Sequence, residues 1–344
     1  MLDHFFNRKD RLLDCPIVLN PKTMTFEDVK LHAELRQRLQ PSTIDKRLRY
    51  ARFMQNHKIP IDFHNPDYID FIRHMDYRER VEQATPEALN HEWKVMQMFL
   101  RAYHIEKWHY KPPSQPPPPM RILPFPEVVH NFFYFRYSKN AYEERLYQYI
   151  FFFGFMIGVR VPSELIEMKV GDVIFEDNDR AYLTITETKK HKSKRMLIPE
   201  RTIMTSTTSK SLKNWIDHWR PKVVDQYSGD ALFLRPDGAP FTSACLRHKL
   251  SDHGKKIWRH FRPYDMRHWC AVARLIRSKI DTGFFDCYSV KNWLGHEKMS
   301  TTEVYIKYAE QYYRELPVDW ISYACRNRIA GSFSSSKNRD EHTR

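Results

Sequence analysis

The amino-acid sequence predicts a mostly α-helical protein with one small β-hairpin or sheet, divided into two domains. Apolar residues recur at helical spacing through most of the 344 residues. Residues 181–188 instead alternate and are rich in β-branched side chains, as in a strand. A run of prolines in residues 111–119 separates a helical first part from a mixed second part.

The first domain, residues 1–110, is predicted to be helical. One helix has Ser42 as its expected N-cap, a second starts near Pro66, and a third starts at Thr85-Pro86, a favourable cap and first-turn pair. The expected core positions of the first helix share one face: Ile44, Leu48, Ala51 and Met54. Its other faces carry four basic residues, Lys46, Arg47, Arg49 and Arg52. These form either a solvated face or a track that contacts phosphates.

Residues 111–119 are the predicted linker. Proline lacks the N–H group that helices and sheets need, so this stretch is expected to be extended and semi-rigid. The second domain is expected to cover residues 120–328, and the polar, serine-rich tail 329–344 is expected to be disordered.

The second domain begins with a strongly apolar helix, Tyr142 to Ile157. A strand is predicted over Ala181 to Thr188, followed by a basic turn at 189–194 and a return strand at Arg195 to Ile198. Another helix follows through Leu212, Trp215, Ile216 and Trp219. A short strand is predicted at Ala231 to Leu234, closed by an Asp237-Gly238 turn, and helices are predicted from there to about residue 328.

The charge balance points to a polyanionic partner. Lys and Arg number 56 against 42 acidic residues, which gives a net charge of +14. Such a field attracts nucleic acid, the commonest polyanion. The five cysteines are odd in number and scattered, which indicates a reduced, cytoplasmic location without a disulfide framework. No signal peptide or apolar run long enough for a membrane span is evident, so no membrane partner is expected.

Four segments of the second domain carry candidate chemistry. They are Gly158-Val159-Arg160-Val161-Pro162-Ser163-Glu164-Leu165, the basic turn, Tyr264-Asp265-Met266-Arg267-His268, and Leu294-Gly295-His296 with Tyr305 nine residues later. Cleaving a phosphodiester without metal requires two cations on the non-bridging oxygens, an acid for the departing oxygen and a nucleophile. Arg160, Arg267, a lysine of the turn and Tyr305 supply this set, with His296 as a further donor.

These motifs resemble those of the tyrosine recombinase (integrase) family, and the resemblance covers roughly residues 30–320. The family pattern is an arginine in Gly-x-Arg…Glu-Leu, a β-hairpin lysine, His-x-x-Arg, Leu-Gly-His and a tyrosine nine residues on. The matching positions here are Arg160, Arg267, His296 and Tyr305. The Tyr305 position in this spacing favours it over Tyr308, which lies one helical turn further on.

The resemblance implies a fold and a mechanism. A helical N-terminal domain and a catalytic domain would close around double-stranded DNA, and Tyr305 would form a 3′-phosphotyrosyl bond that needs no metal, ATP or other cofactor. Relatives act as homo-tetramers on DNA, joined by exchanged C-terminal segments, so a monomer or weak oligomer is expected off DNA. Pro317 to Arg328 is the candidate exchanged segment.

Two departures from the family pattern affect the site. One extra residue separates Arg160 from Glu164, which leaves the role of this glutamate open. Tyr264 stands where the family usually has histidine; a phenol can donate a hydrogen bond but cannot act as a base near pH 7. Tyr264 is therefore either a donor to the phosphate or a packed core residue, and His296 is either a phosphate donor or a helix cap. This Tyr-x-x-Arg variant more loosely resembles archaeal virus and plasmid integrases.

The lysine of the basic turn is ambiguous. Strand alternation puts Lys189 on the same face as Leu183 and Ile185, which favours it as the acid over Lys190. Lys192 and Lys194 are expected to touch phosphate or water. Two rival functions remain: a type IB topoisomerase, which shares the chemistry but rejoins the same strand, and a DNA-binding relative without catalysis.

Overall fold

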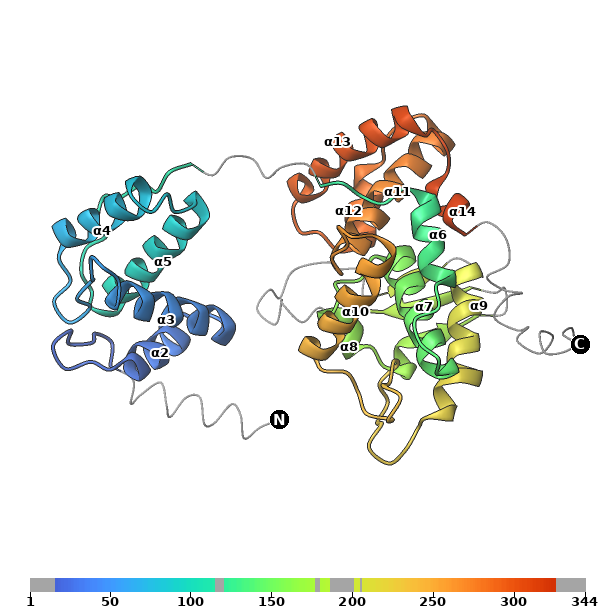
Figure 1. The fold of residues 1–344 in the computed structure, drawn as a ribbon, viewed down its shortest axis with the longest axis horizontal. Helices are drawn as coiled ribbons and strands as arrows, with labels where there is room; N and C mark the ends of the chain where they lie inside the picture. The colour runs from blue at the N-terminus through green and yellow to red at the C-terminus, as the bar shows by residue number, and fades with distance from the viewer. Residues whose placement is uncertain (1–15, 115–120, 177–179, 186–200, 205, 326–344) are drawn as a thin grey trace, which may run out of the picture. The chain divides into compact units, whose positions relative to one another are not determined.

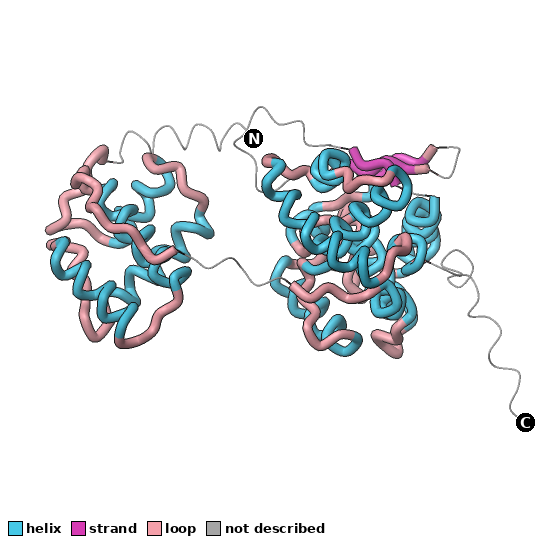
Figure 2. The backbone as a smooth tube through the Cα atoms, turned by 90° about the horizontal axis from the view of Figure 1, so that it is seen from above, coloured by secondary structure: helices cyan, strands magenta, loops and turns pink. Residues whose placement is uncertain are grey.

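The computed structural model describes residues 16–114, 121–176, 180–185, 201–204 and 206–325. Its contacts divide the chain into two units, Met1–Pro119 and Met120–Arg344, each with its own apolar core (Figures 1 and 2). The expected basic turn, the return strand at 195–198 and the tail at 329–344 lie outside the described residues. Within the described residues, no helix is long and apolar enough to cross a membrane.

The N-terminal unit is built from α2 (Phe26–Leu35), α3 (Pro41–Gln55), α4 (Tyr68–Arg80) and α5 (Pro86–Ala102). Helix α5 is the central element, since α2, α3 and α4 all pack against it. The predicted face of α3 is buried at Ile44, Leu48, Ala51 and Met54. These residues join aromatic side chains such as Phe71 and Phe99 in one core.

Helix starts in this unit follow local capping chemistry. Thr85 caps α5 by accepting a hydrogen bond from the Ala88 N–H, and Pro86 occupies the first turn, as predicted. The predicted cap at Ser42 is wrong: α3 begins at Pro41, and Gln40 is its N-cap. Proline needs no N–H partner and has a helical φ, so Pro41 takes the first turn and Ser42 falls inside the helix. Asp67 caps α4, one residue after Pro66.

The C-terminal unit is organised around α7 (Ala141–Ile157) and α11 (Asp265–Thr282), which pack against each other. Helix α7 is buried along almost its whole length, as its apolar sequence predicts, and α6 (Pro126–Tyr134) packs beside it. Helix α11 also contacts α12 (Cys287–Leu294), α13 (Met299–Glu315) and α14 (Trp320–Ala324) (Figure 1). The remaining helices are α8 (Ser163–Glu167), α9 (Ser206–Asn214) and α10 (Ser243–Ile257).

A small antiparallel sheet has the order β1-β2-β3, with β1 (Val173–Phe175), β2 (Ala181–Thr184) and β3 (Arg201–Met204) (Figure 2). In this register Leu183 pairs with Val173 on one side and with Thr202 on the other. The predicted strand at 181–188 is described as a strand only through Thr184. Neither β1 nor β3 was predicted. The return strand was expected before Pro199, and β1, with three residues, is too short to show an alternating pattern.

Two segments of the C-terminal unit differ from expectation in detail. Ala231 to Leu234 is not a strand; Ala231 and Leu234 form isolated bridges to Lys169 and Pro240. Pro236 and Pro240 lack the N–H groups that would extend a ladder here. The predicted turn is present, with Gly238 at φ +82°, a conformation that favours glycine. The predicted helix through Leu212 to Trp219 is formed by α9, followed by a π-helical turn, Trp215–Trp219.

Candidate active site

The first motif is positioned by the end of helix α7. Gly158 ends the helix at φ +75°, and a Cβ there would lie 2.9 Å from Cys270 of α11 and 3.0 Å from Leu294 of α12. Glycine therefore lets three helices approach at this point. The chain then runs through Arg160 to the start of α8, where Glu164 is buried.

Glu164 holds Arg160 in place. One carboxylate oxygen accepts a hydrogen bond from the Arg160 N–H at 2.7 Å, and the other pairs with the Arg160 guanidinium. The extra residue in the motif thus still leaves Glu164 one helical turn from Arg160. The same carboxylate lies 3.9 Å from Nη1 of Arg267. This geometry gives Glu164, whose role the sequence left open, a position between the two arginines.

Arg267 is the most deeply buried cation of the site, with 2% of its surface exposed. Its Nη1 donates to the Gly158 carbonyl at 2.8 Å, and its Nη2 donates to the Leu294 carbonyl. Its Nε has no hydrogen-bond partner among the described residues. Burial, and then the charge of Arg160, lower the pKa of Arg267. Two guanidinium groups thus lie at one buried carboxylate, and a cationic site of this kind suits an anion.

The fourth motif, Leu294-Gly295-His296, brings His296 beside the candidate nucleophile. Gly295 ends α12 at φ +65°, and the His296 N–H donates back to the Lys291 carbonyl at 3.0 Å. His296 therefore does belong to a helix cap through its backbone. Its side chain is separate from this role: Nδ1 lies 2.8 Å from Oγ1 of Thr302, and the ring stacks on Tyr305 with an interplanar angle of 11°.

Tyr305 lies on α13 with 5% of its surface exposed. Its hydroxyl lies 2.7 Å from Nδ1 of His268, and burial raises the pKa of the phenol well above its usual value. Two neighbouring phenols bind backbone instead: Tyr308 accepts from the Arg121 N–H at 3.0 Å, and Tyr312 accepts from the Leu123 N–H at 2.8 Å. This difference supports Tyr305 over Tyr308 as the nucleophile.

Tyr264 precedes α11 and is 39% exposed, so it is not a core residue. Its ring meets His268 edge to face at a centroid distance of 4.9 Å. The structure therefore brings together Arg160, Tyr264, Arg267, His296 and Tyr305, from α11, α12, α13 and the segment before α8. The lysine candidates Lys189 and Lys190, and the basic residues Lys192 and Lys194, lie outside the described residues.

Two side chains of the site were not singled out from the sequence. His268 directly follows Arg267 and lies one helical turn from Tyr264; that spacing was a usable signal. Arg121 lies far away in the sequence, just after the prolines, and nothing local marks it. Its Nη1 pairs with Asp265 at 2.8 Å, and its charge acts on both His268 and Tyr305.

The four basic residues of α3 do not share one face. Lys46 and Arg49 are exposed beside an open pocket of about 460 Å³, whose lining is Lys46, Arg49, Tyr50, Phe53, Arg78 and Ala88. Arg52 instead lies over the Phe26 ring at 5.8 Å. Arg47 is half-buried, and burial, with the charge of Arg101, lowers its pKa. Lys46 and Arg49 are therefore the better placed pair for phosphate contacts.

Comparison with known proteins identifies the family. The model of the phage integrase family matches residues 136–312, which include every described candidate catalytic residue. The chain belongs to the phage integrase family. Its members are tyrosine recombinases, and the segment that matches runs from just before α7 into α13, the helix that carries Tyr305. A search of curated proteins finds no significant match.

Solved structures of similar fold include three recombinases. XerH in its post-cleavage complex with palindromic difH DNA is 13% identical, with 90% of this chain and 93% of that chain covered and a TM-score of 0.60. A lambda integrase (75–356) dimer on a COC′ core site is 11% identical, with 82% and 95% covered and a TM-score of 0.56. Tn1549 transposon integrase with circular intermediate DNA is 16% identical, with 82% and 95% covered and a TM-score of 0.55. At these identities the similarity shows the shared, mostly helical fold.

Proposed function

We propose that this phage integrase family member is a site-specific DNA recombinase that cuts and rejoins DNA through a 3′-phosphotyrosyl intermediate at Tyr305. The observation that carries the proposal is the buried Tyr305 hydroxyl in one site with the guanidinium groups of Arg160 and Arg267. These cations would bind the negative charge of a phosphodiester.

The proposed reaction proceeds by direct displacement. Arg160 and Arg267 bind the non-bridging oxygens of the scissile phosphate, with Tyr264 and His296 as further donors. The Tyr305 oxygen attacks phosphorus, the bond to the 5′ oxygen breaks, and a lysine (Lys189 or, alternatively, Lys190) protonates the leaving oxygen. The phosphotyrosyl bond stores the energy of the broken bond, so the free 5′ hydroxyl of a partner strand reverses the step without ATP or metal.

DNA binding would use both units. The similar XerH, lambda integrase and Tn1549 integrase structures are complexes with DNA. In this chain the net charge of +14 and the exposed Lys46 and Arg49 support backbone contacts to a DNA duplex. Domains 1–110 and 120–328 would grip opposite sides of the duplex, joined at residues 111–119, with the protein on DNA in the cytoplasm.

Assembly on DNA is proposed to be tetrameric, with the segment from Pro317 exchanged between subunits. In this structure Trp320 and Ala324 of that segment are buried, and α14 packs against α6 and α11 of its own chain. Exchange would replace these contacts with the same contacts to a neighbouring subunit.

The test is covalent capture. The protein is incubated with a pool of short nicked duplexes of randomised sequence, in which the cleaved fragment diffuses away, and protein-linked DNA is isolated under denaturing conditions. We expect an adduct that maps to Tyr305 by mass spectrometry and resists EDTA. Tyr305→Phe should abolish it and leave DNA binding nearly intact, whereas the control Tyr308→Phe should retain it. An adduct in Tyr305→Phe that Tyr308→Phe lacks would reassign the nucleophile.

The captured duplex also separates the rival functions. Strand exchange between two labelled copies of it indicates a recombinase, whereas relaxation of supercoiled DNA with rejoining of the same strand alone indicates a type IB topoisomerase. Tight DNA binding by a protein that never forms an adduct would indicate a DNA-binding relative without catalysis.

A further inference from the structure

The hydroxyl of Tyr305 must lose a proton when it attacks phosphorus, and the described site contains few groups that can accept one. Arg121, Arg160 and Arg267 are donors only. Glu164 is engaged by the backbone and side chain of Arg160. His296 presents its ring face to Tyr305, because the two rings are nearly parallel, and its Nδ1 lies beside Thr302. Tyr264, at the position where relatives usually carry histidine, is a phenol and not a base near neutral pH.

His268 has the geometry that these groups lack. Its Nδ1 lies 2.7 Å from the Tyr305 hydroxyl, a normal distance for a hydrogen bond from oxygen. Among the described residues no other acceptor is hydrogen-bonded to the Tyr305 hydroxyl, so the phenol donates and Nδ1 accepts. The imidazole proton is then on Nε2, and the Nδ1 lone pair points at the reacting oxygen.

The surroundings of His268 keep the ring neutral before DNA binds. Burial, and then the charges of Arg121 and Arg267, lower its pKa to about 4. The polar and charged groups that face it are Arg121 from the segment before α6, Tyr264 and Arg267 from α11, and Tyr305 from α13. The carboxyl of Asp265 is directed to Arg121. A neutral imidazole is therefore available as an acceptor throughout the neutral pH range.

We propose that His268 is a catalytic residue that accepts the phenol proton of Tyr305 during DNA cleavage. As the bond from the Tyr305 oxygen to phosphorus forms, the proton passes to Nδ1 of His268, which becomes an imidazolium. The bond from phosphorus to the 5′ oxygen breaks, its electron pair leaves with that oxygen, and the lysine proposed above supplies the proton there. In the reverse step His268 returns its proton to the departing phenol.

The bound phosphate makes this transfer more favourable than it is in the free protein. Arg121 and Arg267 oppose a positive charge on His268 when the site is empty. A phosphodiester held by the arginines adds a negative charge close to the ring, and an opposite charge favours the protonated form. A bound phosphate therefore makes His268 a better proton acceptor than it is in the empty site.

The inference rests on the proposed function, and it is tested on the same captured duplex. Single-turnover adduct formation is measured from pH 6 to pH 9 for the wild type, His268→Gln and the control His253→Gln. Glutamine keeps a hydrogen-bond acceptor near Tyr305 but takes no proton at these pH values. His253 is a matched control, since it is a buried histidine of the same unit whose pKa burial also lowers to about 4, and it packs on Tyr147 away from the site.

We expect His268→Gln to lower the cleavage rate about 10²–10⁴-fold at pH 7, the usual contribution of general base catalysis. Without a base, only the ionised phenol attacks, so the variant's rate should rise about tenfold per pH unit below the phenol pKa. The wild type and His253→Gln should show a nearly flat profile. His268→Ala should lose activity similarly and regain part of it when imidazole is added.

Three results would overturn the inference. The first is a cleavage rate of His268→Gln equal to that of the wild type. The second is a reduced rate whose pH dependence has the same slope as that of the wild type, because a residue with a packing role lowers the rate without changing the need for a proton acceptor. In both cases an adduct at wild-type Tyr305 leaves the proposed function standing. The third is a wild-type protein that forms no adduct, which would contradict both the proposed function and the role of His268 as its base.

Discussion

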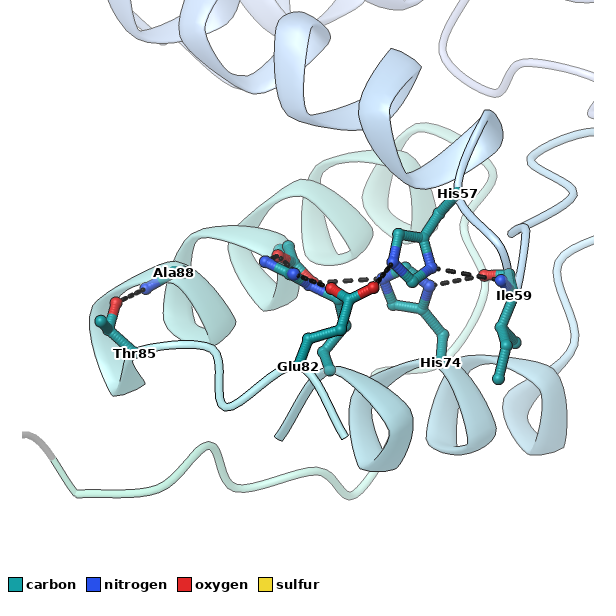
Figure 3. Close-up of polar contacts among 8 residues, drawn as sticks. His57, Ile59, His74, Glu82, Thr85 and Ala88 are labelled. Carbon is teal, nitrogen blue, oxygen red and sulfur yellow. Dashed lines mark hydrogen bonds and ion pairs between the residues drawn. The ribbon is translucent and has the colours of Figure 1, made fainter. Parts of the chain in front are cut away.

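Both units of the chain bury a cluster of charged side chains, and the clusters differ in whether every buried donor has a partner. In the N-terminal unit Glu92 has no exposed surface, and its two oxygens face His74 Nε2 at 3.1 Å and Arg78 Nη2 at 2.9 Å. Arg78 also pairs with Glu82, which accepts from His57 Nε2 at 2.9 Å. Figure 3 shows His57, His74 and Glu82 converging between the helices, with both histidines directed to Ile59.

The cluster of the C-terminal unit leaves a buried donor unsatisfied. Arg160 and Arg267 both lie at the carboxylate of Glu164, and Arg267 Nε has no partner among the described residues. In the N-terminal cluster every named charge already faces an opposite one. Burial of charge alone therefore does not mark a functional site, whereas a buried cationic donor without a partner can be satisfied by an anionic ligand.

Removing a carboxylate from the balanced cluster should have the largest effect on stability. Glu92→Gln leaves His74 and Arg78 without their buried partner, and breaking such a pair costs about 3–5 kcal/mol. We expect hydrogen exchange of α4 and α5 in the full chain to accelerate accordingly. Asp76→Asn, which removes an exposed partner of Arg80, should leave exchange unchanged. Equal effects of the two variants would contradict the structural role of the buried cluster.

A substitution of Tyr264 tests the cluster of the C-terminal unit, around Arg160 and Arg267. If its exposed hydroxyl donates to the phosphate, Tyr264→Phe should slow single-turnover cleavage about 10²–10³-fold, the usual loss for one such donor. DNA affinity and thermal stability should not change, and Tyr264→His should recover part of the rate. Wild-type cleavage by Tyr264→Phe would remove this residue from the catalytic set and leave the arginines and His296 to bind the phosphate.

Lowering the pH should destabilise the C-terminal unit more than the N-terminal unit. Burial lowers the pKa of His253 and of His268 from 6.5 to about 4. As the pH is lowered, these imidazoles take up protons near pH 6.5 in the unfolded chain but only near pH 4 in the folded chain. The free energy of unfolding therefore falls as the pH is lowered from 6.5 to 4, by at most roughly 3 kcal/mol for each histidine. In the N-terminal unit burial also lowers the pKa of His32 and His91, but by less than for His253 and His268, so its stability should fall less in this range. Burial opposes ionisation of Glu92, but the hydrogen bonds from His74 and Arg78 outweigh it and lower its pKa, so the contribution of Glu92 is lost only at lower pH.

The readout is the pH dependence of hydrogen-exchange protection, corrected for intrinsic rates. Protection of α10 and α11 should decline more between pH 6.5 and 4 than protection of α4 and α5. His253→Gln should remove part of that decline. Loss of protection in α4 and α5 at the higher pH would reverse the comparison.

The smallest effect concerns the surface of the N-terminal unit. A footprint of 6–10 phosphates loses about 10³–10⁵ in affinity between 50 and 200 mM salt, and a nearly flat dependence would contradict two-domain binding. Lys46→Ala and Arg49→Ala should each reduce the slope of log affinity against log salt by about 1. Arg73→Ala, on α4 beside Asp70, is the control and should keep the wild-type slope.

Features that depend on neighbouring residues could be predicted from the sequence, whereas contacts between segments far apart in the sequence could not. The Thr85-Pro86 start of α5 and the buried face of α3 depend on spacing within a few residues. The contact of His268 with Tyr305 joins two helices 37 residues apart, and Arg121 reaches Asp265 across 144 residues. Such contacts depend on tertiary packing, which a single sequence does not display.

The backbone bonds of Tyr308 and Tyr312 also fix the order in which the site can form. The helix that carries Tyr305 holds Arg121 and Leu123, which precede these tyrosines by 187 and 189 residues. A ribosome releases the first of these segments long before the last, and the loop between them must close before either hydroxyl meets its partner. A nascent chain therefore forms these two contacts only after nearly the whole unit has been synthesised, so the helix that carries Tyr305 lacks both anchors in an unfinished polypeptide.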